Sequence, residues 1–179
     1  MDQMSSLFHA TTPGDTSAQR RPEPCLLLLP GLFVVGELEV PQGMRLKDFL
    51  CTARSGLVPV LNPRSTGLQT IDSTAYLKLA EVPLIVHFGE AGRADPSEFT
   101  LKEARAVSLT LAPGWTATGD IFLTPAQSVS ALVAPSNDPF LPMARPSLRD
   151  AGGDDLVPLS VGTFTAFVNR GFITAVLSR

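Results

Sequence analysis

Hydrophobic and polar residues alternate along several short segments of this chain, which is the pattern of β-strands with one buried face. In segment 32–40 the alternating apolar residues are Val34, Leu38 and Val40. An unbroken apolar run at 25–29 and a Pro-Gly turn precede that segment. Two further apolar segments, 57–61 and 140–144, also predict strands. Each contains a proline, Pro59 or Pro142, so we expect an edge strand or a bulge at these places.

Helical spacing occurs at one place in each half of the chain. In 45–53 four apolar residues recur at i, i+3, i+4 and i+7, and they would lie on one face of a short helix. They are Leu46, Phe49, Leu50 and Ala53. In the second half Thr124-Pro125 predicts a helix start ahead of 129–133, with threonine as the N-cap and proline in the first turn.

The chain matches itself when it is shifted by 83 residues, without a gap from 25/108 to 63/146. Most of the identities are glycines and prolines, which mark turns and interruptions of strands. The matched pairs are Leu26/Leu109, Leu28/Leu111, Pro30/Pro113, Gly31/Gly114, Gly36/Gly119, Pro59/Pro142 and Pro63/Pro146. A second match relates 76–88 to 165–177 at an offset of 89 residues. Its turns, at 80–82 and 169–171, predict a closing hairpin in each copy, with Asn169 and Gly171 tolerating a positive φ.

These patterns predict a mainly β, α+β chain made of two tandem, pseudo-symmetric, small antiparallel β units. Each unit would be barrel- or sandwich-like and would carry one short helix. The expected organisation is a flexible tail at 1–24, a first repeat at 25–90, a linker at 91–106 and a second repeat at 107–179. A unit of this size is marginally stable alone, so we expect the two to share a core.

Composition and charge exclude several classes of protein. The chain has 179 residues, of which 44% are hydrophobic and 17% charged, and its net charge is −3. An acidic chain with scattered basic residues disfavours nucleic-acid binding. The longest apolar run, 25–35, is too short to cross a membrane as a helix and is broken by Pro30-Gly31. The first ten residues lack the apolar core of a signal peptide, so a cytoplasmic location is expected.

Candidate catalytic and metal-binding groups are few. Cys25 and Cys51 form no disulfide framework and have no partner at metal-ligand spacing, which is typical of thiols in a reducing compartment. We expect His87 to point outward from its strand, and a pairing of Cys51 with His87 remains an alternative. The acidic stretch 150–155 is interpreted as a solvated loop rather than a cation site. No catalytic, cofactor-binding or metal-binding residue is therefore predicted, and no cofactor.

Two equivalent residue pairs are candidates for an interface. Leu32 and Trp115 each follow the Pro-Gly turn of their copy, and we expect them to pack in the core or between the units. Glu37 and Asp120 each follow the matched glycine. An acid at the same place in both copies is interpreted as structural, for example as an acceptor in a turn, with a shared symmetric interface as the alternative.

Short motifs also resemble an uncharacterised bacterial domain family. They are Gly36-x-Leu38-x-x-Pro41, then Arg45-Leu46-x-Asp48-x-Leu50, a strand with a proline, and Asn169-Arg170-x-x-Ile173. That family typically has G-x-L-x-x-P, R-L-S-D-x-L-N and a closing strand with N-x-x-x-I. The second copy departs from it at 128–131 and the first at Ala80-Glu81. The resemblance implies a bacterial source and a small β-rich domain, and no activity.

The resulting hypothesis is a non-catalytic protein–protein interaction module, accessory subunit or assembly component of a bacterial complex. It would bind a protein partner or itself, without nucleic acid or membrane insertion. The alternative is a regulatory module that binds a small molecule between the two repeats. An enzyme that uses Cys51, His87 or the acidic loop ranks last.

Overall fold

The computed structural model describes residues 19–53, 56–65, 74–89, 102–112, 114–134, 136–156 and 164–178. The first half of the chain contains β1 (Arg20–Leu29), β2 (Leu32–Pro41), α1 (Leu46–Thr52), β3 (Leu57–Ser65), β4 (Thr74–Lys78), η2 (Leu79–Glu81) and β5 (Leu84–His87). The second half contains β6 (Glu103–Leu111), β7 (Trp115–Leu123), α3 (Val129–Val133), β8 (Phe140–Arg149), β9 (Thr165–Asn169), η3 (Arg170–Phe172) and β10 (Ile173–Ser178). The η elements are single turns of 3-10 helix.

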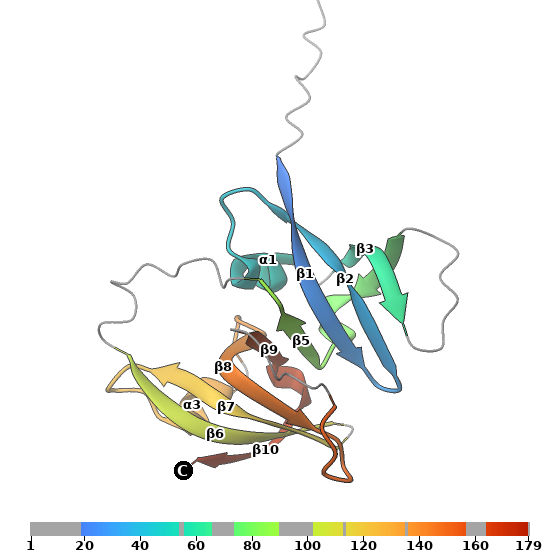
Figure 1. Ribbon diagram of the computed structural model, residues 1–179. Helices are drawn as coiled ribbons and strands as arrows, with labels where there is room; N and C mark the ends of the chain where they lie inside the picture. Colours follow the sequence, from blue (N-terminus) through green and yellow to red (C-terminus); the bar gives the residue numbers. More distant parts are fainter. Residues whose placement is uncertain are drawn as a thin grey trace, which may run out of the picture.

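The strands form one antiparallel sheet in the order β10-β6-β7-β8-β9-β5-β1-β2-β3-β4. The prediction of a mainly β, antiparallel fold is confirmed. The two halves are not separate sheets, because β5 of the first half pairs with β9 of the second. Figure 1 shows the result: the blue and green strands of the first half curl into an upper lobe, the yellow to red strands form a lower lobe, and β5 and β9 meet between them.

The order of elements and the order of strands in the sheet are the same in both halves. In each half the fifth strand pairs with the first, and the first four strands follow in sequence across the sheet. The pairing registers also correspond. Leu57 lies opposite Lys78 in β3–β4, and Phe140 lies opposite Asn169 in β8–β9. The third strands are thus related by an offset of 83 residues and the fourth strands by an offset of 91 residues.

A glycine is required at the same place in both halves, where the third strand passes close to the second. A Cβ atom on Gly36 would lie 2.5 Å from Val60 Cγ1, and one on Gly119 would lie 2.6 Å from Met143 Cγ. The register of β2–β3 and that of β7–β8 both shift beside these glycines, as at a β-bulge. The matched mid-strand glycines therefore mark a close approach of two backbones.

The expected alignment of the first strands is wrong by one residue. Cys25 lies opposite Gly36, and Val107 lies opposite Gly119, so that β6 follows β1 by 82 residues. The extra residue lies in the second turn, 112–114, which is one residue longer than the turn at 30–31. Pro113 itself lies outside the described residues.

The expected closing hairpins are also wrong. Strands β9 and β10 pair with other strands and not with each other, and the same holds for β4 and β5. A turn of 3-10 helix separates the two strands in each half and directs the chain across to the first strand. The offset is accordingly 91 rather than 89 residues, and Gly171 is not among the described residues with a positive φ.

The predicted boundaries need correction at the tail and at the end of the linker that leads into β6. Strand β1 begins at Arg20 and β6 at Glu103, inside the segments expected to be a tail and a linker. Residues 1–18 and 90–101 lie outside the described part of the chain. Pro22 and Pro24 fit within β1 because this portion pairs with β2 alone, and β5 joins only from Cys25 onward.

The other strand prolines follow the same rule. Strands β3 and β8 are interior strands rather than edge strands. Yet Pro59 and Pro142 lie beyond the last residues that pair with β2 and β7, so that each has a strand partner on one side only. In α3 the helix begins later than expected: the N-cap is Ser128, whose hydroxyl accepts from the Ala131 N–H at 3.1 Å, and not Thr124.

The core has two apolar clusters, one on each side of the central strands β1 and β5. Leu26 and Val86 belong to the cluster that includes most of the second half. Leu27 and Ile85 belong to the cluster of the first half, which also takes in Phe140 and Phe167 of the second. Because both faces of β1 are covered, its apolar run does not alternate. The junction between the halves is therefore the middle of the core.

Candidate functional site

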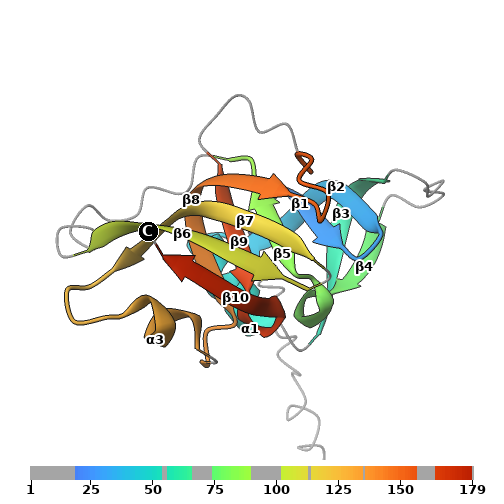
Figure 2. The ribbon, with the colours of Figure 1, turned by 90° about the horizontal axis from the view of Figure 1, so that it is seen from below.

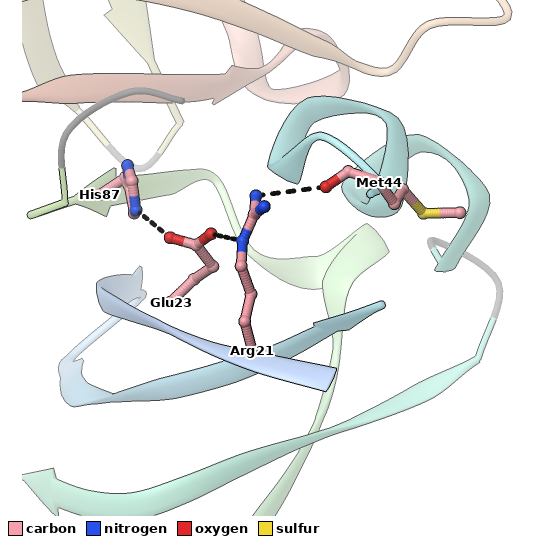
Figure 3. A network of polar contacts seen from close by, with 4 residues as sticks. All are labelled: Arg21, Glu23, Met44 and His87. Carbon is pink, nitrogen blue, oxygen red and sulfur yellow. Dashed lines mark hydrogen bonds and ion pairs between the residues drawn. The ribbon is translucent and has the colours of Figure 1, made fainter. Parts of the chain in front are cut away.

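A partly buried polar network of the first half lies at the start of β1, beside the junction of β5 with β9. His87 Nε2 lies 2.6 Å from Glu23 Oε2, and Glu23 also forms an ion pair with Arg21. Arg21 in turn donates a hydrogen bond of 3.2 Å to the carbonyl oxygen of Met44, ahead of α1 (Figure 3). The carboxylate thus joins the end of β5 to the loop between β2 and α1.

The expectation that His87 points outward is wrong. Its side chain is 4% exposed, and the four residues of β5 are all buried. The alternation rule fails here because β5 is covered on both faces and has strand partners on both sides, β1 and β9. Glu23 was assigned to a tail, so the sequence analysis missed the partner that makes a buried histidine acceptable.

A second polar cluster connects α1 of the first half to the segment that leads into β8. Cys51 Sγ donates to Asp138 Oδ1 at 2.9 Å, and Lys47 Nζ lies 2.7 Å from Asp138 Oδ2. Burial acts to raise the pKa of Asp138. The hydrogen bonds from Cys51 and Lys47 and the charges of Lys47 and Arg170 outweigh this effect, and the pKa of the carboxyl lies below its ordinary value.

The same cluster makes Cys51 a poor nucleophile. Burial, followed by the hydrogen bond to Asp138, raises the pKa of Cys51 to about 12. Burial and the nearby Glu23 carboxylate likewise raise the pKa of Cys25. Only a thiolate attacks or ligates efficiently, so both sulfurs are suited to packing rather than to reaction. The structure pairs Cys51 with Asp138 and His87 with Glu23, and it does not bring these two residues together as a catalytic pair.

Asn169 contributes another polar contact between the two halves. Its side-chain amide donates to the carbonyl oxygens of Ala80 and Val82, both at 3.2 Å, and its Oδ1 accepts from the Gly171 N–H at 3.1 Å. One buried side chain therefore links the 3-10 turns of the two halves. The sequence placed Asn169 at a turn, but the partners of its amide lie about ninety residues away in the chain, and no local pattern indicates them.

The four candidate interface residues occupy two kinds of place. Trp115 is buried in the cluster of the second half and its ring contacts Phe33 of the first half, with centroids 6.4 Å apart. Leu32 packs against the other cluster. Glu37 accepts from the Asn62 side-chain amide at 3.3 Å, and Asp120 forms an ion pair with Arg145.

Asn62 and Arg145 are the two described non-glycine residues with a positive φ, 48° and 49°. They lie at equivalent places, 83 residues apart, within the bulge opposite each matched glycine. The acids at Glu37 and Asp120 thus each hold the side chain of a residue in an unfavourable backbone conformation. In both halves the acid thus contacts a residue of its own half.

The two end strands of the sheet carry exposed apolar side chains. Tyr76 of β4 is 64% exposed and Leu177 of β10 is 68% exposed. The residues at the corresponding positions of the junction are Phe167 of β9 and Val86 of β5, which are 6% and 0% exposed. Strands β4 and β10 have one strand partner each within the described ranges, β3 and β6 respectively.

One polar depression lies on the second half, over β6, β7 and β8. Its volume is about 500 Å³. The lining includes the hydroxyl residues Ser108, Thr118 and Ser147 and the cations Arg145 and Arg149. All of its lining residues belong to the second half, so this depression is not a site between the two units.

The acidic loop is organised by its own backbone. Asp150 Oδ1 accepts from the N–H groups of Gly152 and Asp154, at 2.8 and 3.0 Å, which is the geometry of an Asx turn. Within the described residues no three or more His, Cys, Asp or Glu side chains are grouped so that they could hold a metal ion. In the same residues no helix has both the length and the apolar character that crossing a bilayer requires.

Comparison with known proteins gives no relative from which a function could be transferred. No family model matches the chain, and no curated protein or solved structure matches it either. The function must therefore be argued from the geometry of the junction and of the two end strands.

Proposed function

We propose that this protein is a non-catalytic assembly component, built from two copies of one small β unit, that binds protein through the free edges of its sheet. The observation that carries this proposal is the contrast between the edges. The β5–β9 pair is buried in the core, whereas β4 and β10 expose apolar side chains and backbone groups without a strand partner among the described residues. Exposed apolar edge strands are templates for pairing with another chain.

The duplication is supported by correspondence at several independent levels. The element order, the strand order, the bulge beside the matched glycines and the positive φ within it all recur. Gly36 and Gly119 are each required by a close approach of the third strand. Two unrelated β segments would not be expected to share both a register shift and a residue with positive φ at equivalent positions.

A non-catalytic role is supported by the contacts of the side chains that could take part in catalysis. Cys51 is held as a thiol, and His87 and Glu23 satisfy each other inside the junction. Asn169, the third buried polar residue in the part of the chain that the structure describes, donates to backbone carbonyl groups. In each case a local structural contact accounts for the group, and none of them lines the polar depression.

The test is the size of the complex that the chain forms in its native cell. The variant is Tyr76→Lys with Leu177→Lys, because lysine on an edge strand opposes further pairing. The control is Val35→Lys, which changes an exposed apolar residue on an interior strand, β2. We expect wild type and control to migrate in native extracts as a complex well above 19.0 kDa, and the edge variant to migrate as the free chain. A complex of unchanged size in the edge variant, or a wild-type chain that migrates alone, would contradict the proposal.

A further inference from the structure

The strands that end the sheet are the counterparts of the two strands that join its halves. In the strand order each half begins with its fifth strand and ends with its fourth. The fourth strand of the second half, β9, pairs with the fifth strand of the first half, β5. The fourth strand of the first half, β4, and the fifth strand of the second half, β10, remain at opposite ends of the sheet.

The free strands have the residue types that the formed junction uses. Strand β4 reads Thr-Ala-Tyr-Leu-Lys and β9 reads Thr-Ala-Phe-Val-Asn. The aromatic residue is buried in β9, as Phe167, and exposed in β4, as Tyr76. On the other side of the junction Val86 of β5 is buried, while its counterpart Leu177 of β10 is exposed. Two apolar surfaces of matching chemistry are thus left uncovered in a single chain.

We propose that chains of this protein join head to tail, with β4 of one copy pairing antiparallel with β10 of a second copy, as β9 pairs with β5 within the chain. The inference deepens the proposed function and rests on it, because it names the partner of the free edges. The occupant is a second copy since the pairing surface that β4 needs is the one that β10 offers.

The internal junction also fixes the register. Within the chain Phe167 lies opposite Ile85 and Ala166 lies opposite Val86. The same offset of 91 residues places Tyr76 opposite Val176 and Ala75 opposite Leu177 of the second copy. Tyr76 would then cover Val176, which packs on the core cluster of its own half, and Leu177 would face a small residue as Val86 does.

The two edges do not meet within one chain. They lie at opposite ends of the strand order; in Figure 2 β4 is at the right and β10 at the lower centre. A contact between two different surfaces of the same chain is heterologous, and repetition of it closes a ring or extends a filament. Each added chain would bury one β4 edge and one β10 edge, which are the exposed edges of the free chain.

The register is tested by disulfide trapping between two variants of the full chain, each with one cysteine added to the native Cys25 and Cys51. Ala75→Cys and Leu177→Cys are purified separately, mixed and oxidised with a glutathione couple. Directly opposed residues of antiparallel strands lie within the reach of a disulfide. We expect a covalent dimer that contains one copy of each variant, formed at least tenfold faster than in a mixture of Tyr76→Cys with Leu177→Cys, in which the two thiols would point to opposite faces. The native Cys25 and Cys51 are held as thiols and serve as the background in wild type.

Light scattering on the purified chain separates this inference from the proposed function. We expect wild type and Val35→Lys to form multiples of the 19.0 kDa chain, with at least tenfold weaker association in Tyr76→Lys and in Leu177→Lys. Both edge residues are largely exposed, so unfolding midpoints should stay near wild type and exclude a folding defect. A purified wild type that is monomeric at high concentration, or trapping without preference for the predicted register, would overturn the inference. In that case, if the edge variant still loses its complex in native extracts, the proposed function holds with a different protein as the partner. If the edge variant keeps its complex, the proposed function and this inference are both wrong.

Discussion

Strands β9 and β5 pair with each other in this molecule, whereas the corresponding strands, β4 and β10, lie at opposite ends of the sheet. Where β9 meets β5, Phe167 and Val86 are buried, whereas their counterparts Tyr76 of β4 and Leu177 of β10 are mostly exposed. The residue types are alike, so the difference in burial comes from the presence or absence of a neighbouring strand. The comparison shows that each end strand of the sheet keeps an exposed apolar side chain at a position that is buried where β9 meets β5.

The largest expected difference between the two places is the cost of removing the aromatic ring. Phe167→Ala should lower the free energy of unfolding by about 3–5 kcal/mol, because it leaves a cavity in the core at the junction. Tyr76→Ala should change it by less than about 0.5 kcal/mol when measured in dilute protein, where the free chain is studied. Urea unfolding of both variants gives the comparison. Similar losses in the two variants would mean that β4 is already covered in the isolated chain.

Much of the fold could be predicted from the sequence because its signals are local. Alternation located β2, and the spacing of Leu46, Phe49 and Leu50 located α1. The repeated glycines were recognised, but the bulges beside them were not predicted. The errors arose where tertiary context decides. Pro22 and Pro24 led to the prediction of a tail. They lie in a strand because this segment pairs with β2 on one side, which the local sequence does not indicate. The turns at 80–82 and 169–171 were interpreted as hairpins. Each is a turn of 3-10 helix, and the strands on either side of it pair with other strands.

The contacts at the junction could not be predicted in the same way. His87 belongs to a strand of four residues with an apolar pattern, and its burial depends on β9, far along the chain. Cys51 and Asp138 are 87 residues apart, and neither has a local pattern that indicates the other. The sequence match at an offset of 89 residues did not align β4 with β9. The pairing registers show that the offset is 91 and that the two strands have similar sequences.

A smaller difference is expected for the polar residues that follow the aromatic ones. Asn169→Ala leaves the carbonyl oxygens of Ala80 and Val82 without their side-chain donor at the junction, and should cost about 1–3 kcal/mol of unfolding free energy. Its counterpart Lys78 makes an exposed ion pair with Glu81, so Lys78→Ala should have almost no effect. Thermal and urea unfolding of the two variants measure this. An equal loss of unfolding free energy in the two variants would mean that the contact of Asn169 with the first half does not stabilise the protein.

The smallest effect is a pH dependence at the second contact between the halves. The pKa of Asp138 is lowered by Cys51, Lys47 and Arg170 against the opposing effect of burial, so the native state binds fewer protons there than the unfolded state. Its stabilisation is therefore complete above the ordinary carboxyl pKa of about 4 and is lost as the pH falls through the lowered value. Asp138→Asn should be about 1 kcal/mol less stable than wild type at pH 7, and the gap should close as the pH falls through the lowered pKa of Asp138. The control is Glu81→Gln on the free edge, whose exposed ion pair should give a gap near zero at every pH. A gap for Asp138→Asn that persists in acid would show that its carboxylate charge does not hold α1 to the second half.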